Sequence, residues 1–388
     1  MLVSLPLTTL CALAAAFMWL ALLLLPWRPW STRERINARS LDGRHTSPVD
    51  LTQITVLIPA RDEASCIEQT LGALHKQGEF GAIILIDDQS SDGTKSSAEQ
   101  FAARHALAAL KIIDGQTPPP GWSGKLWALH QGLSCVKTPY VLLLDADIAL
   151  AENMASTLLQ KLQDEDLDSV SVMATLYMGS WAEKLLLPPF IYFFKIIYPF
   201  RLANSEQSKL AAAAGGCVLT KTDRLRAIGG FEALKSAIID DCTLAKKIKS
   251  SGGRIWIGLS RDVEAVRPYA SLTNIWNMVA RTAFTQLHYS VLLLLLCTAL
   301  MLLGYVAPLL ALLLGDMTAK AWAMVALCLL YVSYLPTIKY YELPIWWTFT
   351  LPIASAMFLA MTWTSALRYL RGERSRWKNR SYQRESME

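Results

Sequence analysis

Short acidic motifs recur where predicted strands end. PARDE (Pro59–Glu63) ends one apolar run, DDQSSDGT (Asp87–Thr94) ends a second, and DAD (Asp145–Asp147) ends another. Two carboxylates at positions i and i+2 can bind one hard cation such as Mg²⁺ or Mn²⁺, which keeps waters and takes phosphate oxygens as its other ligands. A DxD alone is an ordinary loop sequence, but two further acidic strand ends favour metal binding by Asp145 and Asp147.

A second pair of carboxylates, Asp240 and Asp241, lies in IIDDCTLAKKIKSSGGRIWI (residues 238–257). The pair precedes a predicted helix whose Leu244 and Ile248 would face the core. A single Asp is enough to cap a helix N-terminus. One carboxylate of the pair is therefore available for acid–base chemistry.

The elements that must position these residues alternate between strands and helices. Ile54–Ile58, Ala82–Ile86 and Tyr140–Leu144 are nearly continuous apolar runs of strand length, as in buried parallel strands. The stretches between them have helical periodicity. This alternation predicts an α/β domain with a mostly parallel sheet, in which ligands bind at the carboxyl ends of the strands.

Several other classes of protein find no support in the sequence. Neither GxGxxG nor GxxxxGK[ST] is present, which disfavours dinucleotide dehydrogenases and P-loop NTPases. The seven cysteines have no zinc-ligand or disulfide-framework spacing. The net charge of +5 is modest, and the excess lies beside apolar runs, so we expect no nucleic-acid partner.

Apolar runs at both ends of the chain indicate a membrane protein. Leu7–Trp27 is uncharged and long enough to cross about 30 Å of hydrocarbon, and it has no cleavage site, so we expect a retained anchor. Three more runs follow late in the chain: Val291–Leu314, Ala321–Thr337 and Trp346–Leu367. We therefore expect an anchor at 1–27, a cytoplasmic domain at 28–289, transmembrane or re-entrant helices at 290–367 and a basic tail at 368–388.

Arginine clusters orient these segments. Arg28, Arg33, Arg35 and Arg39 follow the first run, and the tail contains seven Lys or Arg residues, all of which favour the cytoplasm. If all three late runs crossed the membrane, the tail would lie outside. We therefore expect one run to be re-entrant or interfacial, with Ala321–Thr337 as the candidate. Leu185–Leu202, apolar and interrupted by three prolines, is either core or a segment that lies on the membrane.

Taken together, PARDE, DDQSSDGT, GWSGK, DAD, AGG and the DD-x-x-L helix resemble glycosyltransferase family 2, the inverting enzymes of the GT-A fold, over about residues 53–289. GWSGKLWALHQG, DDCTLAKKIK and VARTAFTQL resemble more narrowly the hopanoid-associated membrane branch of that family. The family's (Q/R)xxRW motif has only a partial match, MVART (Met278–Thr282), which lacks the Trp.

The resemblance implies a role for each candidate residue. Asp145 and Asp147 would bind the divalent cation, and Asp241 would be the catalytic base, with Asp240 in place of the usual Glu. Arg281 would assist the departure of the leaving group. The residues implied to bind the nucleotide part of the donor are Pro59, Glu63, Asp87, Asp88 and Lys125.

The implied activity is transfer of a sugar from a nucleotide-sugar to a lipid acceptor such as a hopanoid, at the cytoplasmic side of a bacterial inner membrane. A processive polysaccharide synthase is an alternative, although it would normally have the missing Trp motif. A catalytically silent nucleotide-sugar-binding subunit is another, although a pure binder has no need of the base.

Overall fold

The computed structural model describes residues 5–38, 49–269, 271–377 and 380–383. Of the basic residues that flank the apolar runs, Arg39, Lys378 and Arg384 lie outside these ranges. The chain forms two compact units. The α/β unit comprises Glu34–Tyr177 and Leu202–Pro268. The helical unit comprises Met1–Arg33, Met178–Arg201 and Tyr269–Glu388.

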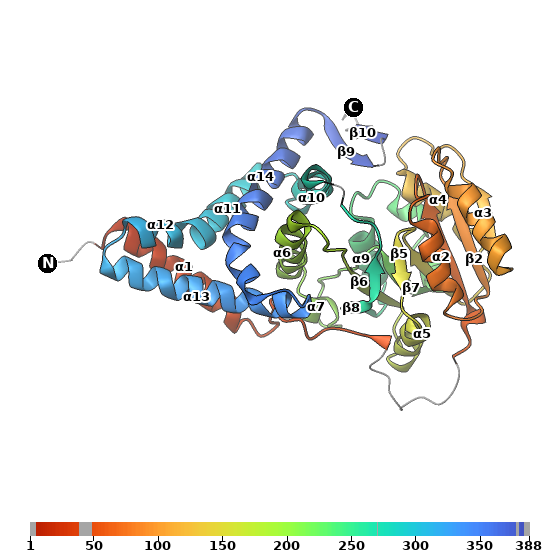
Figure 1. Ribbon diagram of the computed structural model, residues 1–388, viewed down its shortest axis with the longest axis horizontal. Coiled ribbons are helices and arrows are strands. Elements are labelled where there is room, and N and C mark those ends of the chain that lie inside the picture. The colour runs from red at the N-terminus through yellow and green to blue at the C-terminus, as the bar shows by residue number, and fades with distance from the viewer. Residues whose placement is uncertain (1–4, 39–48, 270, 378–379, 384–388) are drawn as a thin grey trace. The chain divides into compact units, whose positions relative to one another are not determined.

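An eight-stranded sheet in the order β3-β2-β1-β4-β7-β6-β8-β5 forms the centre of the α/β unit (Figure 1). The pairs β1–β2, β2–β3, β1–β4 and β6–β8 are parallel, whereas β4–β7, β6–β7 and β5–β8 are antiparallel. The strands are β1 (Ile54–Ala60), β2 (Ala82–Asp87), β3 (Leu110–Asp114), β4 (Tyr140–Leu144), β5 (Ile148–Leu150), β6 (Ser169–Thr175), β7 (Cys217–Lys221) and β8 (Ile255–Ala265). The predicted α/β class, its mostly parallel sheet and the three predicted strands are confirmed.

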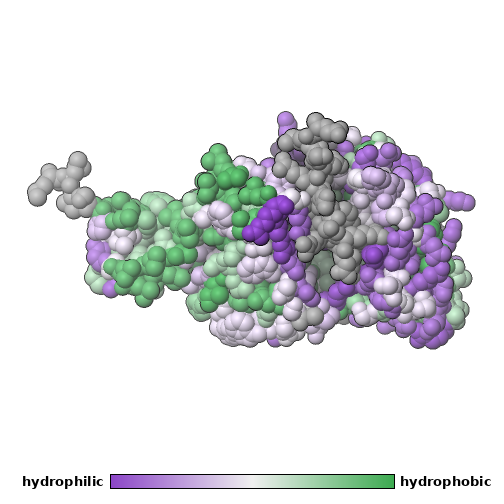
Figure 2. All heavy atoms as spheres, turned by 90° about the horizontal axis from the view of Figure 1, so that it is seen from above, coloured by the Kyte–Doolittle hydropathy of each residue, from purple (hydrophilic) through white to green (hydrophobic). Residues whose placement is uncertain are grey.

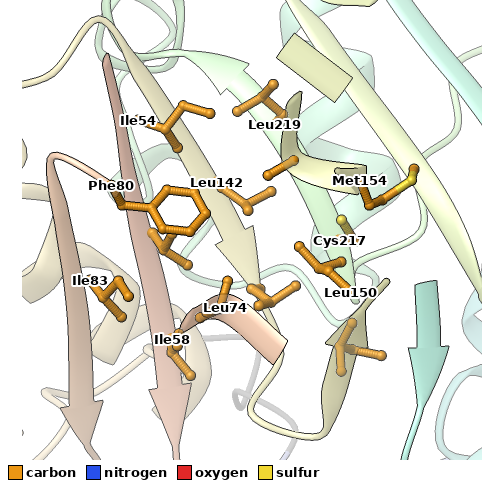
Figure 3. Close-up of a cluster of buried hydrophobic side chains, with 14 of the residues drawn as sticks. Ile54, Ile58, Leu74, Phe80, Ile83, Leu142, Leu150, Met154, Cys217 and Leu219 are labelled. Atoms are coloured by element: carbon orange, nitrogen blue, oxygen red, sulfur yellow. The ribbon is translucent and has the colours of Figure 1, made fainter. Parts of the chain in front are cut away.

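Helices cover this sheet and pack apolar side chains against it to form the core. Leu74 of one helix packs with Ile54, Ile58 and Ile83 of the strands in a cluster that Figure 3 shows. Burial of these side chains stabilises the sheet by about 25 cal/mol per Å² of apolar surface. The helices are α2 (Ile67–His75), α3 (Thr94–His105), α4 (Gly124–Leu133), α5 (Met154–Asp164), α8 (Thr222–Ala227) and α9 (Asp240–Ser250), with short 3₁₀ turns at Leu51–Gln53 and Glu232–Leu234. The short helix α7 (Phe200–Ala203) lies where the chain passes from the helical unit to the α/β unit.

The helical unit contains the apolar runs, and four of its helices are long and apolar enough to cross a membrane: Leu7–Leu24, Val291–Leu314, Met317–Tyr340 and Ile345–Leu370. On the face that Figure 2 shows, hydrophobic residues gather over these helices and hydrophilic ones over the α/β unit. The elements are α1 (Leu7–Leu24), α6 (Trp181–Ile197), α10 (Leu272–Gln286), α11 (Val291–Met301), a π-helix η4 (Leu302–Val306), α12 (Ala307–Leu314), α13 (Met317–Tyr340), a 3₁₀ turn η5 (Ile345–Thr350), α14 (Leu351–Leu370), and strands β9 (Glu373–Trp377) and β10 (Arg380–Gln383).

Helices α1, α12 and α13 lie side by side (Figure 1). Ala12, Ala311, Ala319 and Ala323 form one buried cluster, which lets the helix backbones approach closely. The candidate re-entrant run, Ala321–Thr337, lies inside α13, a helix of 24 residues that continues through Pro336. Its length matches that of a full membrane span.

The segment Leu185–Leu202 is more regular than its prolines suggest. Pro188 and Pro189 both lie inside α6, which begins with a capping box between Ser180 and Glu183. Most of α6 is buried, including the consecutive residues Leu185–Pro189, and the Tyr192 hydroxyl hydrogen-bonds the Ser333 hydroxyl of α13 at 2.7 Å. Of the two interpretations of this segment, the burial of α6 favours a core helix over a segment that lies on the membrane surface.

Candidate active site

The sheet brings the predicted acidic motifs to one edge. In the parallel register of β1 and β2, Ala60 lies beside Asp87, and the Asp88 amide donates to the Ala60 carbonyl at 2.7 Å. Strand β4 runs parallel to β1 on its other side and leads into Asp145, whose amide donates to the Gly216 carbonyl at 3.0 Å. The predicted convergence of strand ends is thus present.

Lys125 joins the two carboxylate pairs. It lies in the first turn of α4, and its Nζ is 2.7 Å from Oδ1 of Asp145 and 3.9 Å from Oδ2 of Asp240. We call Lys125, Asp145, Asp240 and Asp241 the carboxylate cluster. Burial acts to lower the pKa of Lys125, but the charges of Asp145 and Asp240 outweigh it and hold this pKa above its ordinary value. The lysine is therefore a fixed positive charge.

Asp241 is oriented by two backbone amides. Its Oδ2 accepts a hydrogen bond from Gly215 at 2.8 Å, and its Oδ1 accepts one from Cys242 at 2.7 Å. A Cβ atom on Gly215 would lie 3.3 Å from Oδ2 of Asp241 and 3.5 Å from Nζ of Lys125, so a side chain there would crowd the cluster. Neither Asp of the pair is the N-cap of α9, since that position is Ile239.

The environment of Asp241 suits a general base. Burial and the neighbouring Asp240 carboxylate raise the pKa of Asp241 to about 6, against the opposing effects of its two backbone hydrogen bonds and of Lys125. A carboxylate with this pKa is ionised at neutral pH, yet is more basic than an exposed Asp. Asp241 can therefore accept a proton from a hydroxyl.

Arg267, which the sequence analysis did not identify, connects the metal motif to PARDE. Its Nε lies 3.3 Å from Oδ2 of Asp147, and its guanidinium also contacts the Glu63 carboxylate. The Glu63 side chain is only 10% exposed, so the arginine compensates a largely buried charge. We call these three residues the Arg267 bridge.

Strand pairing explains how Arg267 reaches this position. The short strand β5 begins directly after DAD and pairs antiparallel with the end of β8, with Ile148 opposite Ala265. The Val266 amide then donates to the Asp147 carbonyl at 2.8 Å, so Arg267 follows beside the motif. A basic residue two positions after a strand is a signal in the sequence, but its partner depends on this long-range pairing.

The loops after β1 and β2 are tied to each other. The carboxylate of Asp62 accepts from the Ser91 amide at 2.9 Å, and that of Asp92 accepts from the Ala64 amide at 2.9 Å. The Glu63 amide donates to the Thr94 hydroxyl at 2.8 Å. These contacts give the two loops a fixed shape in which Glu63 can reach Arg267.

The other residues implied to bind the donor lie at the same edge. Asp88 is 1% exposed and its carbonyl accepts from Arg61 at 2.6 Å, so it is an interior residue of the loop pair. Asp87 is also buried, and its Oδ1 has no hydrogen-bond partner among the described residues. Pro59 lines a small cavity of about 20 Å³ together with Lys125, Asp145, Gly215 and Asp241.

The residues at DAD fit a divalent cation. The described part of the chain contains no group of three or more potential metal ligands. Asp145 and Asp147 nevertheless offer oxygen ligands with side chains 34% and 30% exposed. Because Mg²⁺ and Mn²⁺ take phosphate oxygens and waters as further ligands, two protein carboxylates suffice when a diphosphate is bound.

Arg281 belongs to the other unit. It lies on α10 of the helical unit, whereas all the other predicted site residues lie in the α/β unit. Its Nε is buried and has no hydrogen-bond partner among the described residues.

A protein with this sheet and these strand-end carboxylates has a GT-A-like α/β fold. A solved structure of a mannosyltransferase from Pyrobaculum calidifontis, in complex with GDP-Man and Mn²⁺, aligns with a TM-score of 0.57 over 94% of this chain and 99% of that chain, at 20% identity. At this identity the likeness concerns the fold. The predicted GT-A fold is confirmed.

The family follows from the sequence of the α/β unit. The family model for Glycosyl transferase family 2 matches residues 55–229. Residues 55–229 therefore match a family 2 glycosyltransferase domain, as predicted for this part of the chain. The match includes Lys125 and DAD and ends before Asp240.

Two relatives add partial similarity. The 4,4'-diaponeurosporenoate glycosyltransferase of Staphylococcus aureus is 27% identical over 135 residues, which is 34% of this chain and 33% of that protein. A Bacillus subtilis protein named "Probable glycosyltransferase YdaM" is 25% identical over 211 residues, or 53% of this chain and 49% of that protein. The chain thus spans a third to a half of the length of these relatives.

Proposed function

We propose that this protein transfers a sugar from a nucleoside diphosphate sugar to a membrane lipid, with inversion at the anomeric carbon. The observation that carries the proposal is the carboxylate cluster: a basic carboxylate, Asp241, lies beside a fixed cation and the DAD motif at the ligand-binding edge of a GT-A-like sheet. A binding subunit would have no use for a carboxylate with a raised pKa at this place.

In this reaction the chain's own residues have distinct tasks. Asp241 accepts the proton of the acceptor hydroxyl while that oxygen attacks the anomeric carbon and the bond to the diphosphate breaks. Lys125 lies where it can stabilise negative charge on the departing diphosphate. Asp145 and Asp147 would hold a divalent cation, which offsets the same charge. The Oδ1 of Asp87, which has no hydrogen-bond partner among the described residues, can accept a hydrogen bond from the nucleoside.

Arg281 is proposed to assist at the diphosphate. Its buried Nε without a hydrogen-bond partner among the described residues supports an anionic partner in the bound state. An arginine binds phosphate oxygens well because its planar guanidinium offers several donors in a fixed geometry.

Two observations support a lipid acceptor. Four helices are apolar and long enough to cross a membrane, and the relative from S. aureus carries a name that specifies glycosylation of diaponeurosporenoate. The narrower motif resemblance supports a hopanoid or a related isoprenoid lipid as the acceptor.

We further propose that the α/β unit and the basic tail both lie in the cytoplasm of a bacterium, at its inner membrane. Helix α14 packs mainly on α10, whereas α13 packs mainly on α1 and α12; α6 contacts both, and α14 runs across the direction of α13 in Figure 1. If α1, α11–α12 and α13 span the membrane and α14 lies along its surface, the tail returns to the side of the Arg28–Arg35 cluster. The interfacial run would then be Trp346–Leu367 and not Ala321–Thr337.

The function is tested by incubating membranes that contain the protein with labelled nucleotide-sugars and a lipid extract. We expect label in the lipid fraction with the wild type and none with Asp241→Asn. Label in a long polysaccharide would instead identify a processive synthase. Absence of both transfer and donor hydrolysis would identify a silent binding subunit.

Orientation has its own test. A cysteine introduced by Arg376→Cys should react with a membrane-impermeant maleimide only after the cells are opened, with the unsubstituted protein as the background control. Labelling of intact cells would show that all the late apolar runs cross the membrane.

A further inference from the structure

The helical unit contains a groove far larger than the cavity at the carboxylate cluster. Its volume is about 490 Å³, within the range of about 300–1,000 Å³ that is typical of small-molecule sites. The residues that line it come from α10, η4, α12 and α14. They are Trp276, Tyr305, Val306, Leu309, Pro352, Ile353, Ala356, Met357 and Ala360. We call it the Trp276 groove.

Two hydrogen bonds and an aromatic contact hold the walls of the Trp276 groove in place. On one side, the Trp276 indole donates to the Thr364 hydroxyl of α14 at 3.3 Å. On the other side, the Trp19 indole donates to the Gly304 carbonyl at 2.9 Å, inside the π-helix that carries Tyr305. Tyr305 in turn packs edge-on against Trp19 at 5.1 Å. The concavity is therefore fixed by the fold and does not depend on a ligand to form it.

The lining selects for hydrocarbon. None of the residues that line the groove carries a charge, and Tyr305 and Trp276 are the two with a polar group. Ala356 and Ala360, one helical turn apart on α14, are exposed and leave room where larger side chains would fill the groove. A π-helix within a helix is also frequent at functional sites.

Helix α10 distinguishes this groove from the ordinary lipid-facing surface. Its buried residues Ile275, Val279 and Phe284 lie on one face, while Asn274 and Asn277 are exposed, so it is amphipathic. The side-chain Oδ1 of Asn277 accepts a hydrogen bond from the Arg368 guanidinium of α14 at 2.8 Å. Along the chain, α10 begins four residues after Pro268, the last residue of the α/β unit. The groove thus combines residues of apolar helices with the helix that continues directly from the α/β unit.

We propose that the Trp276 groove binds the hydrocarbon part of the lipid acceptor. This inference rests on the proposed function and adds the place where the acceptor is recognised. A preformed apolar groove stabilises a hydrocarbon by burying its surface, and it lowers the ordering cost of binding because its walls are already fixed.

Groove-filling substitutions test the proposal. Ala356→Phe and Ala360→Phe place an aromatic ring in the groove from exposed positions, so neither overpacks a core. Ala321→Phe is the matched control, since Ala321 is an exposed alanine of α13 that does not line the groove. We expect each groove variant to raise the KM for lipid acceptor, or to lower transfer, at least tenfold, while donor binding and slow donor hydrolysis stay as in the wild type. Ala321→Phe should behave as the wild type.

A photoactivatable isoprenoid alcohol that carries a diazirine supplies a second readout independent of transfer. It should label peptides of α10 or α14 in the wild type and in Ala321→Phe, but not in the groove variants, and excess phospholipid vesicles should not compete. If Ala356→Phe and Ala360→Phe transfer sugar normally and are photolabelled normally, the groove is not the acceptor site, and the proposed function still stands. Labelling that phospholipid abolishes would make this a site for bulk lipid and would also overturn it. A wild type that glycosylates no lipid would overturn both proposals.

Discussion

The carboxylate cluster and the Trp276 groove are built from opposite materials. The cluster consists of charged side chains held by backbone amides and ion pairs within a cavity of about 20 Å³. The groove consists of apolar side chains around about 490 Å³, and polar contacts only fix its walls. Chemistry on a few atoms needs precise charges, whereas recognition of a hydrocarbon needs volume and shape. Substitutions in the two places should therefore separate catalysis and donor binding from acceptor binding.

The largest effect on catalysis with no effect on either binding site is expected from Asp241→Asn. The amide keeps the size of the side chain but cannot accept the proton, so transfer should fall by about 10²–10⁴-fold, the usual contribution of a general base. Binding of the nucleotide-sugar, measured by calorimetry, and photolabelling of the Trp276 groove should both persist. Turnover near that of the wild type would show that Asp241 is not the base.

Asp145→Ala and Asp147→Ala should affect the donor side only. Each removes an oxygen ligand of the proposed cation, and we expect about 10²-fold weaker donor binding in the presence of Mn²⁺, since a bound metal ion supplies several kcal/mol. Asp114→Ala is the matched control, because this exposed carboxylate ends β3 and pairs with Lys95. Donor affinity that is independent of metal in the wild type and unchanged in both variants would contradict the assignment.

Arg267→Met should also weaken donor binding, but by a smaller factor. Without the guanidinium, the buried Glu63 carboxylate loses its partner and Asp147 loses a fixed neighbour, so we expect about tenfold weaker donor binding and a lower Tm. Arg267→Lys keeps the charge but cannot contact Glu63 and Asp147 together as the guanidinium does. Its donor affinity and Tm should lie between those of the wild type and Arg267→Met. Equal donor affinity in all three proteins would mean that the bridge has no part in the site.

The smallest predicted effect is a shift in pH dependence. Because the pKa of Asp241 is raised to about 6 and the ionised form is the base, kcat/KM should fall as the pH drops through about 6 and level off above it. Asp240→Asn removes the neighbouring negative charge that, together with burial, raises this pKa, so the acidic fall in kcat/KM should move to lower pH. If kcat/KM of Asp240→Asn falls at the same pH as that of the wild type, Asp240 does not influence the pKa of the base.

The carboxylate cluster was largely predictable from the sequence, whereas the Trp276 groove was not. Strands β1, β2 and β4 follow from continuous apolar runs, and the end of each strand fixes the place of PARDE, DDQSSDGT and DAD. The pair Asp240 and Asp241 follows from two carboxylates at the start of a helix, and the family resemblance implied that Asp241 is the base. These features depend on residues close together in the chain, where periodicity and strand ends are informative.

What the sequence could not predict depends on distant contacts. Arg267 reaches Asp147 only because β5 and β8 pair, and the Trp276 groove needs α10, η4 and α14 together. The sequence also left Leu185–Leu202 open between a core segment and a membrane-surface segment, because only tertiary packing shows that α6 continues through its two prolines. Apolar runs reveal how long a helix is but not which side of it faces a cavity.

The bond between Trp19 and Gly304 has a consequence for the assembly of the protein. These residues are 285 positions apart, so helix α1 is synthesised long before the carbonyl that its indole binds. During that interval the whole α/β unit is translated and can fold, because domains generally fold as units during synthesis. If α1 enters a membrane as it is made, its indole meets its final partner only after that interval. Its association with α12 and α13 would then be the closing step of biogenesis, and the groove wall that carries Tyr305 would be completed only when that step is done.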